Sequence, residues 1–237
     1  LDKVSHKAAS INDLVLGRSE LPLPELPTEK NMRQIRAAEK LIRKKRRQYE
    51  NQNRQFTEMQ PDPFLQEYLD RTTFRNKDGE ICEFTSLQKH DLNLVLQKRY
   101  ALLNWQQGSG KTAAVYHRAK YLLKFHKVRN AVILAPAIAT NMTWIPFLTI
   151  NREKFRIVRS NADLETVPEG VLLILSTSIL SKLKRGLSKF VRRTSGKLCL
   201  VFDESDEITN PSSQRTRLVL SIFRRLKYKI LDTGTKS

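Results

Sequence analysis

A short loop with two glycines stands between an apolar run, residues 100–104, and a helix-forming stretch, residues 113–125. Glycines let backbone N–H groups close around an anion, and the N-terminus of a following helix adds positive potential. This order of strand, loop and helix predicts a phosphate-binding loop. The loop and the residue before it comprise Gln107, Gly108, Ser109, Gly110, Lys111 and Thr112.

The side chains of this loop are suited to a nucleoside triphosphate. We expect Lys111 to reach the β and γ phosphates and the Thr112 hydroxyl to complete a Mg²⁺ shell, so the expected cofactors are ATP and Mg²⁺. The full consensus has a further glycine five positions before Gly110, where this chain has Trp105. Taken alone, the loop leaves open a glycine-rich turn without a catalytic role.

A second apolar run, residues 198–202, ends in the acids Asp203 and Glu204. A buried strand of this kind presents its terminal carboxylates at the edge of a sheet. We expect Asp203 to hold Mg²⁺ through water and Glu204 to orient or activate the attacking water. A solvated turn is the alternative for the acids in isolation, and the phosphate loop favours the metal-binding interpretation.

Short apolar runs alternate with amphipathic stretches from about residue 100 onward. Such alternation predicts an α/β fold with a mostly parallel sheet flanked by helices, and runs without two-residue alternation fit strands buried on both faces. The expected strands cover residues 100–104, 131–135, 155–158, 171–175, 198–202 and 228–231.

The order of these motifs resembles the first RecA-like lobe of superfamily 2 helicases and translocases of the Swi/Snf-like kind, whose phosphate loops often lack the first glycine. Residues 203–210 resemble the Asp-Glu-Ala-His box and its following Lys-Asn pair, with Asp206 in the place of the His and Thr209 in that of the Lys. After a helix-like segment, residues 232–235 resemble the next family motif, Thr-Gly-Thr-Pro. Lys236 replaces the Pro of this motif. The resemblance implies that Thr233, Gly234 and Thr235 couple the ATP site to a second lobe.

The resemblance also implies contacts to nucleic acid and to adenine. Pro136, which follows the strand at 131–135, and Thr177 are similar to positions that touch the nucleic-acid backbone. Residues 87–91 resemble Leu-Arg-Pro-His-Gln, whose final Gln reads adenine; Asp91 takes that place here, and Gln88 stands three residues earlier. A plain amphipathic helix over residues 91–97 is the alternative for this segment.

The charge of the chain predicts a polyanionic partner. It has 43 Lys and Arg against 24 Asp and Glu, a formal net charge of +19. Phosphate contacts give affinity with little sequence readout, which suits nucleic acid, DNA rather than RNA. The best candidates for phosphate contacts follow the strand end at residues 174–180, which contains Thr177. They are Lys182, Lys184 and Arg185. A solubilising surface is the alternative for any single one of them.

The first 60 residues are expected to form a basic extension ahead of a motor lobe at 61–237. Three prolines within residues 21–27 predict an extended linker, and residues 28–54 predict a helix with the basic block 43–47 on its polar side. Two cysteines and the lack of an apolar run of roughly 18 residues predict an intracellular, cytoplasmic or nuclear, protein without a membrane span.

These features together predict an ATP-dependent nucleic-acid translocase or helicase. The chain begins with Leu1 and stops just after a motif, so we expect a piece of a longer protein whose second RecA-like lobe supplies an arginine finger. Alone, this piece is expected to hydrolyse ATP poorly. The alternatives are a viral terminase-type packaging ATPase, and a degenerate, non-hydrolysing motor domain that binds nucleic acid.

Overall fold

The computed structural model describes residues 29–194, 197–208 and 210–234. The chain divides into two compact units, residues 1–58 and 59–237. The linker expected at residues 21–27, Thr209, Thr235 and Lys236 lie outside the described residues. None of the described helices is long and apolar enough to cross a membrane.

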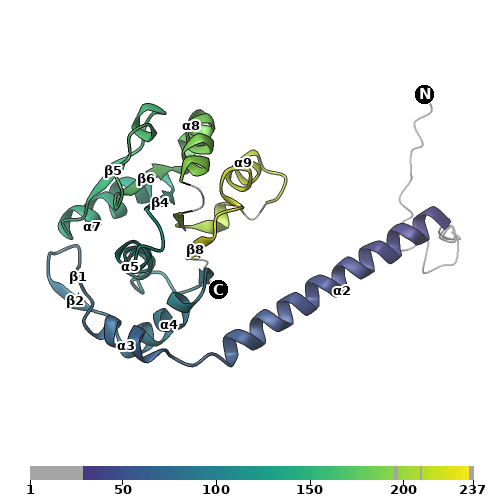
Figure 1. The fold of residues 1–237 in the computed structure, drawn as a ribbon, viewed down its shortest axis with the longest axis horizontal. Helices are drawn as coiled ribbons and strands as arrows, with labels where there is room; N and C mark the ends of the chain where they lie inside the picture. The colour runs from purple at the N-terminus through teal and green to yellow at the C-terminus, as the bar shows by residue number, and fades with distance from the viewer. Residues whose placement is uncertain (1–28, 195–196, 209, 235–237) are drawn as a thin grey trace, which may run out of the picture. The chain divides into compact units, whose positions relative to one another are not determined.

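The described part of the first unit is one long helix, α2 (Glu29–Thr57), which extends three residues beyond the expected end at residue 54 (Figure 1). Several of its described apolar side chains are exposed, with 58% of Leu41 and 64% of Ile42 accessible. Two ion pairs at four-residue spacing, Arg33 with Glu29 at 2.9 Å and Arg46 with Glu50 at 3.0 Å, support the helix. Such exposed pairs add only about 0.2–0.5 kcal/mol each.

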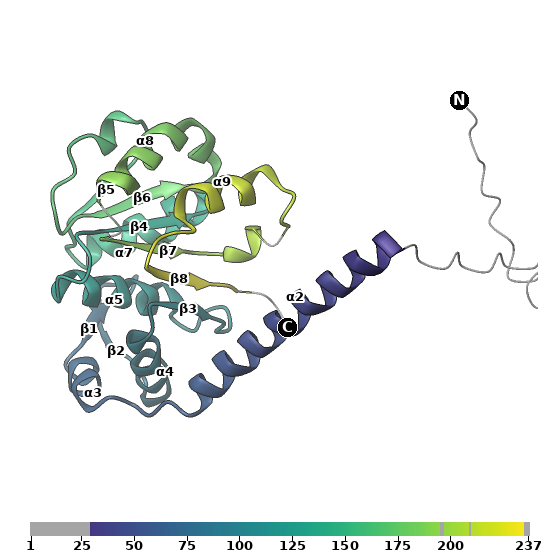
Figure 2. The same cartoon turned by 45° about the vertical axis from the view of Figure 1, so that its right-hand side comes forward.

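The second unit is built on a six-stranded parallel sheet in the order β3-β8-β7-β4-β6-β5 (Figures 1 and 2). All six expected apolar runs form strands, which confirms the predicted α/β class. The strands are β3 (Tyr100–Leu103), β4 (Asn130–Ala135), β5 (Phe155–Ile157), β6 (Leu172–Ser176), β7 (Leu198–Phe202) and β8 (Tyr228–Asp232).

Helices cover both faces of this sheet (Figure 2), which explains why its central strands β4, β6 and β7 are almost entirely apolar and buried. In β4, Ile133 packs toward the core beneath α5 (Lys111–Lys124), and Leu134 packs toward α8 (Leu180–Arg193) and α9 (Gln214–Phe223). Both side chains are 0% exposed. Burying such a side chain contributes about 1.5–3 kcal/mol, so the two cores hold the strand ends in place.

Shorter elements complete the unit. An antiparallel pair of three-residue strands precedes the sheet and was not predicted, because three residues are too few for a periodic pattern. These elements are α3 (Pro63–Asp70), β1 (Thr73–Arg75), β2 (Ile81–Glu83), α4 (Ser86–Gln97), α6 (Ala137–Ala139), the π-helix η1 (Thr140–Trp144), α7 (Ile145–Ile150), and the 3₁₀ turns η2 (Ala162–Leu164), η3 (Thr177–Ile179) and η4 (Ser205–Ile208).

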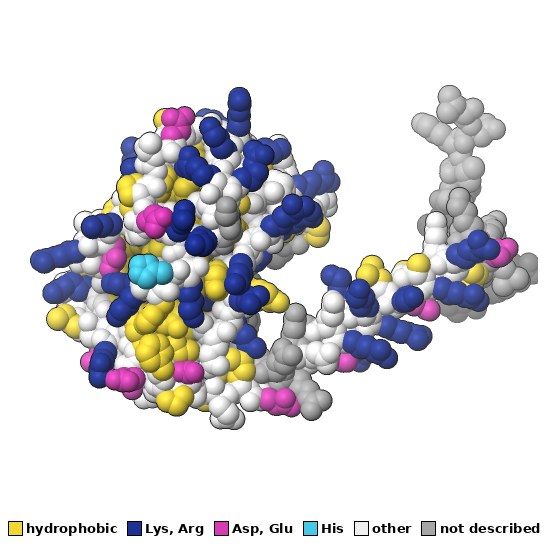
Figure 3. All heavy atoms as spheres, viewed as in Figure 1, with side chains coloured by type: hydrophobic (Ala, Val, Ile, Leu, Met, Phe, Trp, Pro, Cys, Tyr) yellow, Lys and Arg dark blue, Asp and Glu magenta, His cyan; other side chains and the backbone are white. Residues whose placement is uncertain are grey.

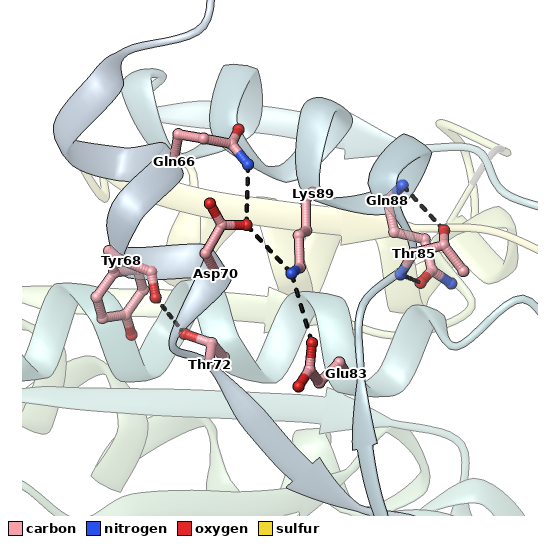
Figure 4. Close-up of polar contacts among 8 residues, drawn as sticks. All are labelled: Gln66, Tyr68, Asp70, Thr72, Glu83, Thr85, Gln88 and Lys89. Carbon is pink, nitrogen blue, oxygen red and sulfur yellow. Dashed lines mark hydrogen bonds and ion pairs between the residues drawn. The ribbon is translucent and has the colours of Figure 1, made fainter.

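Helix α4 begins five residues before the start expected from its apolar pattern, at Ser86 rather than residue 91. Thr85 and Gln88 form a capping box (Figure 4): the Gln88 amide donates to the Thr85 hydroxyl, and the Thr85 amide donates to Gln88 Oε1 at 2.8 Å. Figure 4 also shows Lys89 between Asp70 and Glu83, at 3.1 and 3.6 Å. The first turn of α4 is therefore tied to α3 and β2.

Candidate nucleotide-binding site

The strand order brings three chain segments to one edge of the sheet. Strand β8 lies between β3, which leads into the glycine loop, and β7, which leads into the acids. Leu103 pairs with Asp232, and Phe202 pairs with Leu231. The loop, the acidic box and the segment after β8 therefore meet at the carboxyl ends of adjacent strands, although they are far apart in sequence.

Both glycines of the loop adopt the left-handed conformation, with φ of 82° at Gly108 and 79° at Gly110. Residues with a Cβ rarely take this conformation, so the loop requires glycine at both positions. Gly110 is also the N-cap of α5 and has no side chain to cap the helix. The first amides of α5 are thus left to bind an anion from outside the helix.

The ammonium of Lys111 points back into the loop, where it donates to the backbone oxygens of Trp105 at 2.9 Å and Gln106 at 3.0 Å. A phosphate that enters the loop would offer this cation a stronger, charged acceptor. Lys111 therefore stands at the expected place with partners that a phosphate can replace.

Helix α4 holds the loop through two side chains. Asp91, which we expected at the adenine, accepts a hydrogen bond from the indole Nε1 of Trp105 at 2.9 Å. Gln88 donates through Nε2 to the backbone oxygen of Ser109 at 2.9 Å. The sequence analysis missed these links, although the three-residue spacing from Thr85 to Gln88 is the signature of a capping box and could have placed Gln88 at a helix start.

The acidic box lies directly beside the loop. Asp203 is 8% exposed, and its Oδ2 accepts a hydrogen bond of 2.6 Å from the indole of Trp144, which is fully buried. Glu204 is exposed and has φ of 53°, a conformation uncommon for a residue other than glycine. The backbone thus turns sharply at the residue that we expected to face the attacking water.

Asp232, the last residue of β8, adds an acid that the sequence analysis assigned no role. Its side chain is 1% exposed, and among the described residues neither of its carboxylate oxygens has a partner at hydrogen-bond geometry. Burial, with the Asp203 carboxylate nearby, raises the pKa of Asp232 to about 8. Burial also raises the pKa of Asp203, against the effect of the Trp144 hydrogen bond.

The loop and the acids enclose a common cavity of about 450 Å³. Among the described residues, its lining contains four carboxylates and one cation, Lys111. The lining residues are Gln107, Gly108, Gly110, Lys111, Thr112, Ala139, Thr143, Asp203, Glu204, Asp206, Asp232 and Gly234.

A Mg²⁺ ion fits this donor set. Hard divalent cations are held by one or two carboxylates together with phosphate oxygens and water. The cavity offers the carboxylates of Asp203 and Asp232 and the hydroxyl of Thr112. No group of three or more His, Cys, Asp or Glu side chains suited to a metal occurs in the described part of the chain, so phosphate and water would have to complete the shell.

The segment after β8 also borders the cavity. A Cβ added to Gly234 would lie 3.6 Å from the Lys111 ammonium, and Thr233 is 9% exposed. The expected coupling residues Thr233 and Gly234 are therefore next to the phosphate loop. Their third member, Thr235, lies outside the described residues.

The expected nucleic-acid residues lie around the ends of β4 and β6. Because Ala135 pairs with Ser176, the following residues Pro136 and Thr177 leave adjacent strands at the same edge. Thr177 is 6% exposed and lines a separate surface cavity of about 410 Å³. Figure 3 shows basic side chains gathered over α8 and α9, and the exposed residues of α8 include Lys182, Lys184 and Arg185.

Comparisons with solved structures give this fold a context. The SWI2/SNF2 ATPase core of Sulfolobus solfataricus, solved in complex with dsDNA, matches 65% of the chain at 16% identity with a TM-score of 0.51. Two structures of UvsW, a helicase from bacteriophage T4, match 72% of the chain at 16% identity with TM-scores of 0.52 and 0.54. The chain therefore shares its fold with these proteins, which confirms the resemblance seen in the motifs at the level of the fold.

The match covers 32%, 59% and 34% of the length of those three chains. No protein-family model matches the sequence, and no curated protein matches it.

Proposed function

We propose that residues 61–237 form the ATP-binding first lobe of a nucleic-acid-dependent motor ATPase, a helicase or translocase. The observation that carries the proposal is the meeting of the glycine loop, the acidic box and the segment after β8 around one cavity. A phosphate loop and metal-binding acids on neighbouring strands are the parts that phosphoryl transfer requires.

In this proposal the loop amides and Lys111 bind the phosphates of ATP. Thr112 and Asp203 hold Mg²⁺, which, when bound, bridges the phosphates and neutralises charge that develops during transfer. Glu204 orients the attacking water and accepts its proton. Asp91 and Gln88 position the loop through Trp105 and Ser109, instead of reading the adenine.

Nucleic acid, DNA by preference, would lie on the surface that includes Pro136, Lys182, Lys184 and Arg185. Thr177 would contribute through the edge of its cavity, because its side chain is nearly buried. The SWI2/SNF2 ATPase core that shares this fold was solved with dsDNA, which supports the choice of partner. Residues 1–60 would form a basic extension that adds a second charged surface.

Hydrolysis would need a second lobe that supplies an arginine to the transition state, because this cavity contains no cation besides Lys111 among the described residues. Thr233 to Thr235 would pass the state of the ATP site to that lobe.

The proposal is tested in the longest natural chain that carries this sequence, by measuring ATP hydrolysis with and without duplex DNA. We expect DNA to stimulate turnover in the unaltered protein. Glu204→Gln should bind nucleotide with similar affinity and lose most of its turnover, since the amide keeps the shape of the side chain but accepts no proton. Near-normal hydrolysis by this variant would show that Glu204 does not act on the water, and a lack of any turnover in the unaltered protein would favour a degenerate motor.

A further inference from the structure

Asp232 is a buried acid for which the described structure provides no counterpart. Its two carboxylate oxygens have no hydrogen-bond partner, and its side chain is 1% exposed at the wall of the cavity. A buried and unsatisfied carboxylate costs several kcal/mol unless a proton, a donor or a cation compensates it. Without a cation, a proton shared with the Asp203 carboxylate compensates this buried acid. A divalent cation that displaces this proton would compensate both carboxylates at once.

The strand register explains why this acid lies beside Asp203. Phe202 pairs with Leu231 in the parallel ladder between β7 and β8, so the next residues, Asp203 and Asp232, leave the two strands side by side. Adjacent strands are about 4.8 Å apart, a separation at which one cation can contact a carboxylate from each strand.

Lys111 cannot be the lasting counter-charge of this pair. Its ammonium donates to the backbone oxygens of Trp105 and Gln106. When phosphates enter the loop, the proposed function draws the same ammonium toward them. The two carboxylates then face a polyanion, and a divalent cation between them is the charge that makes the arrangement favourable.

We propose that Asp232 is a second carboxylate ligand of the divalent cation, paired with Asp203. The inference rests on the proposed nucleotide site and extends it, since it makes the end of β8 part of the metal site. It also implies that the cation can bind without nucleotide, with water in place of the phosphate oxygens, because two carboxylates hold a hard cation better than one. Asp232 directly precedes Thr233, so binding of a cation at Asp232 would affect the position of the coupling segment.

The test is Mn²⁺ binding to the full chain without nucleotide, followed by the electron paramagnetic resonance signal of the free ion. We expect one site of measurable affinity in the unaltered protein. Asp232→Asn keeps the shape but cannot ionise to bind a cation, and it should weaken Mn²⁺ binding by about tenfold or more, as ligand-shell changes do. Asp232→Leu is a second variant that leaves no unsatisfied polar group, and it should show the same loss.

Asp206→Asn is the matched control, because Asp206 lines the same cavity, is exposed, and loses the same single charge. It should weaken Mn²⁺ binding much less than Asp232→Asn does. Equal losses in the two variants would reduce the effect to general electrostatics and overturn the proposal, as would normal Mn²⁺ affinity in both variants of Asp232.

Lys111→Ala separates this inference from the proposed function. It should lose ATP binding yet keep or strengthen the Mn²⁺ site, since it removes a nearby positive charge. If Asp232→Asn binds Mn²⁺ normally while Lys111→Ala has lost ATP, the nucleotide site stands and only the second ligand is wrong. If the unaltered protein binds Mn²⁺ but never ATP, the proposed function is wrong and the metal pair stands.

Discussion

Trp144 links the segment after β4 to the acid that we expect at the metal. It is fully buried, it ends the π-helix η1, and it donates to Asp203 at 2.6 Å. A π-helical turn is rare and is frequent at functional sites. Since η1 and α6 follow Pro136, this hydrogen bond would link the proposed metal site to the segment that follows the proposed nucleic-acid contact.

We predict that Trp144→Phe keeps the fold but weakens binding of MgATP. The phenyl ring fills most of the space, whereas a hydrogen bond to a charged group, worth about 1.5–3 kcal/mol, is lost. The measurement is a calorimetric titration with MgATP, with thermal unfolding to check the fold. Unchanged MgATP affinity in a well-folded variant would show that the indole serves packing alone.

His117 should make the domain sensitive to acid. It is 4% exposed among Phe74, Phe84 and Tyr116, and neither ring nitrogen has a partner in the described structure. Burial, with the nearby Lys120, lowers its pKa from 6.5 to about 3. Between these values the unfolded chain takes up a proton that the folded chain does not, so folding stability falls as the pH is lowered from 6.5.

We predict that His117→Leu removes much of this acid sensitivity, and that His90→Leu, which replaces an exposed histidine of α4, leaves it in place. The measurement is the free energy of unfolding by urea at several pH values between 4 and 7. Each pKa unit is worth about 1.4 kcal/mol, so the loss in the unaltered protein should reach a few kcal/mol. Parallel pH curves for the unaltered chain and His117→Leu would contradict this role of the buried imidazole.

The N-terminus of helix α4 is capped by a residue that also contacts the phosphate loop. Gln88 caps its own helix through Thr85 and reaches the Ser109 backbone at 2.9 Å, while Thr85 takes part in the cap alone (Figure 4). The two residues therefore allow helix stability and loop position to be separated.

We predict that Gln88→Ala lowers both stability and MgATP affinity, and that Thr85→Ala lowers stability alone. Loss of a cap costs about 1 kcal/mol, and loss of the contact to Ser109 frees the loop that holds the phosphates. Thermal unfolding and MgATP titration of both variants are the measurements. Equal nucleotide affinity in the two variants would mean that Gln88 does not position the loop.

The elements that sequence predicts well here are those determined locally. The six strands were recognisable because each is a short, largely apolar run. The glycine loop was recognisable because its neighbours in sequence are its neighbours in space. The pair of Asp203 and Asp232 was not predictable, because it depends on β8 being inserted between β3 and β7. The bond from Trp144 to Asp203 joins residues 59 positions apart and depends on the same sheet order.

The chain as a whole is strongly basic, whereas the described lining of its nucleotide cavity is acidic. The chain carries a net +19, yet the described lining of the cavity at the loop has four carboxylates and one lysine. A bare polyanion would be repelled there, so nucleotide should bind far better with Mg²⁺ than in the presence of a chelator. The basic surface over α8 and α9 (Figure 3) is where we propose that nucleic acid binds.

We predict that replacing Lys182, Lys184 and Arg185 together by Gln weakens DNA binding and flattens its salt dependence by about one unit of slope per lost phosphate contact. The measurement is duplex DNA affinity at several salt concentrations. The matched variant neutralises three residues of the block 43–47 in α2, and it should have the smaller effect. A slope that is unaltered by the first set and strongly reduced by the second would place DNA on the N-terminal extension.

The most direct measurement of the proposed nucleotide site is a titration of the full chain with MgATP, compared with Lys111→Ala. The unaltered chain should bind one MgATP per chain, and a chelator should abolish most of the binding. Lys111→Ala should show no detectable binding while it unfolds at a similar temperature, because the ammonium is the only cation of the cavity among the described residues. An unchanged affinity for MgATP in Lys111→Ala would contradict the assignment of this loop as the phosphate-binding site.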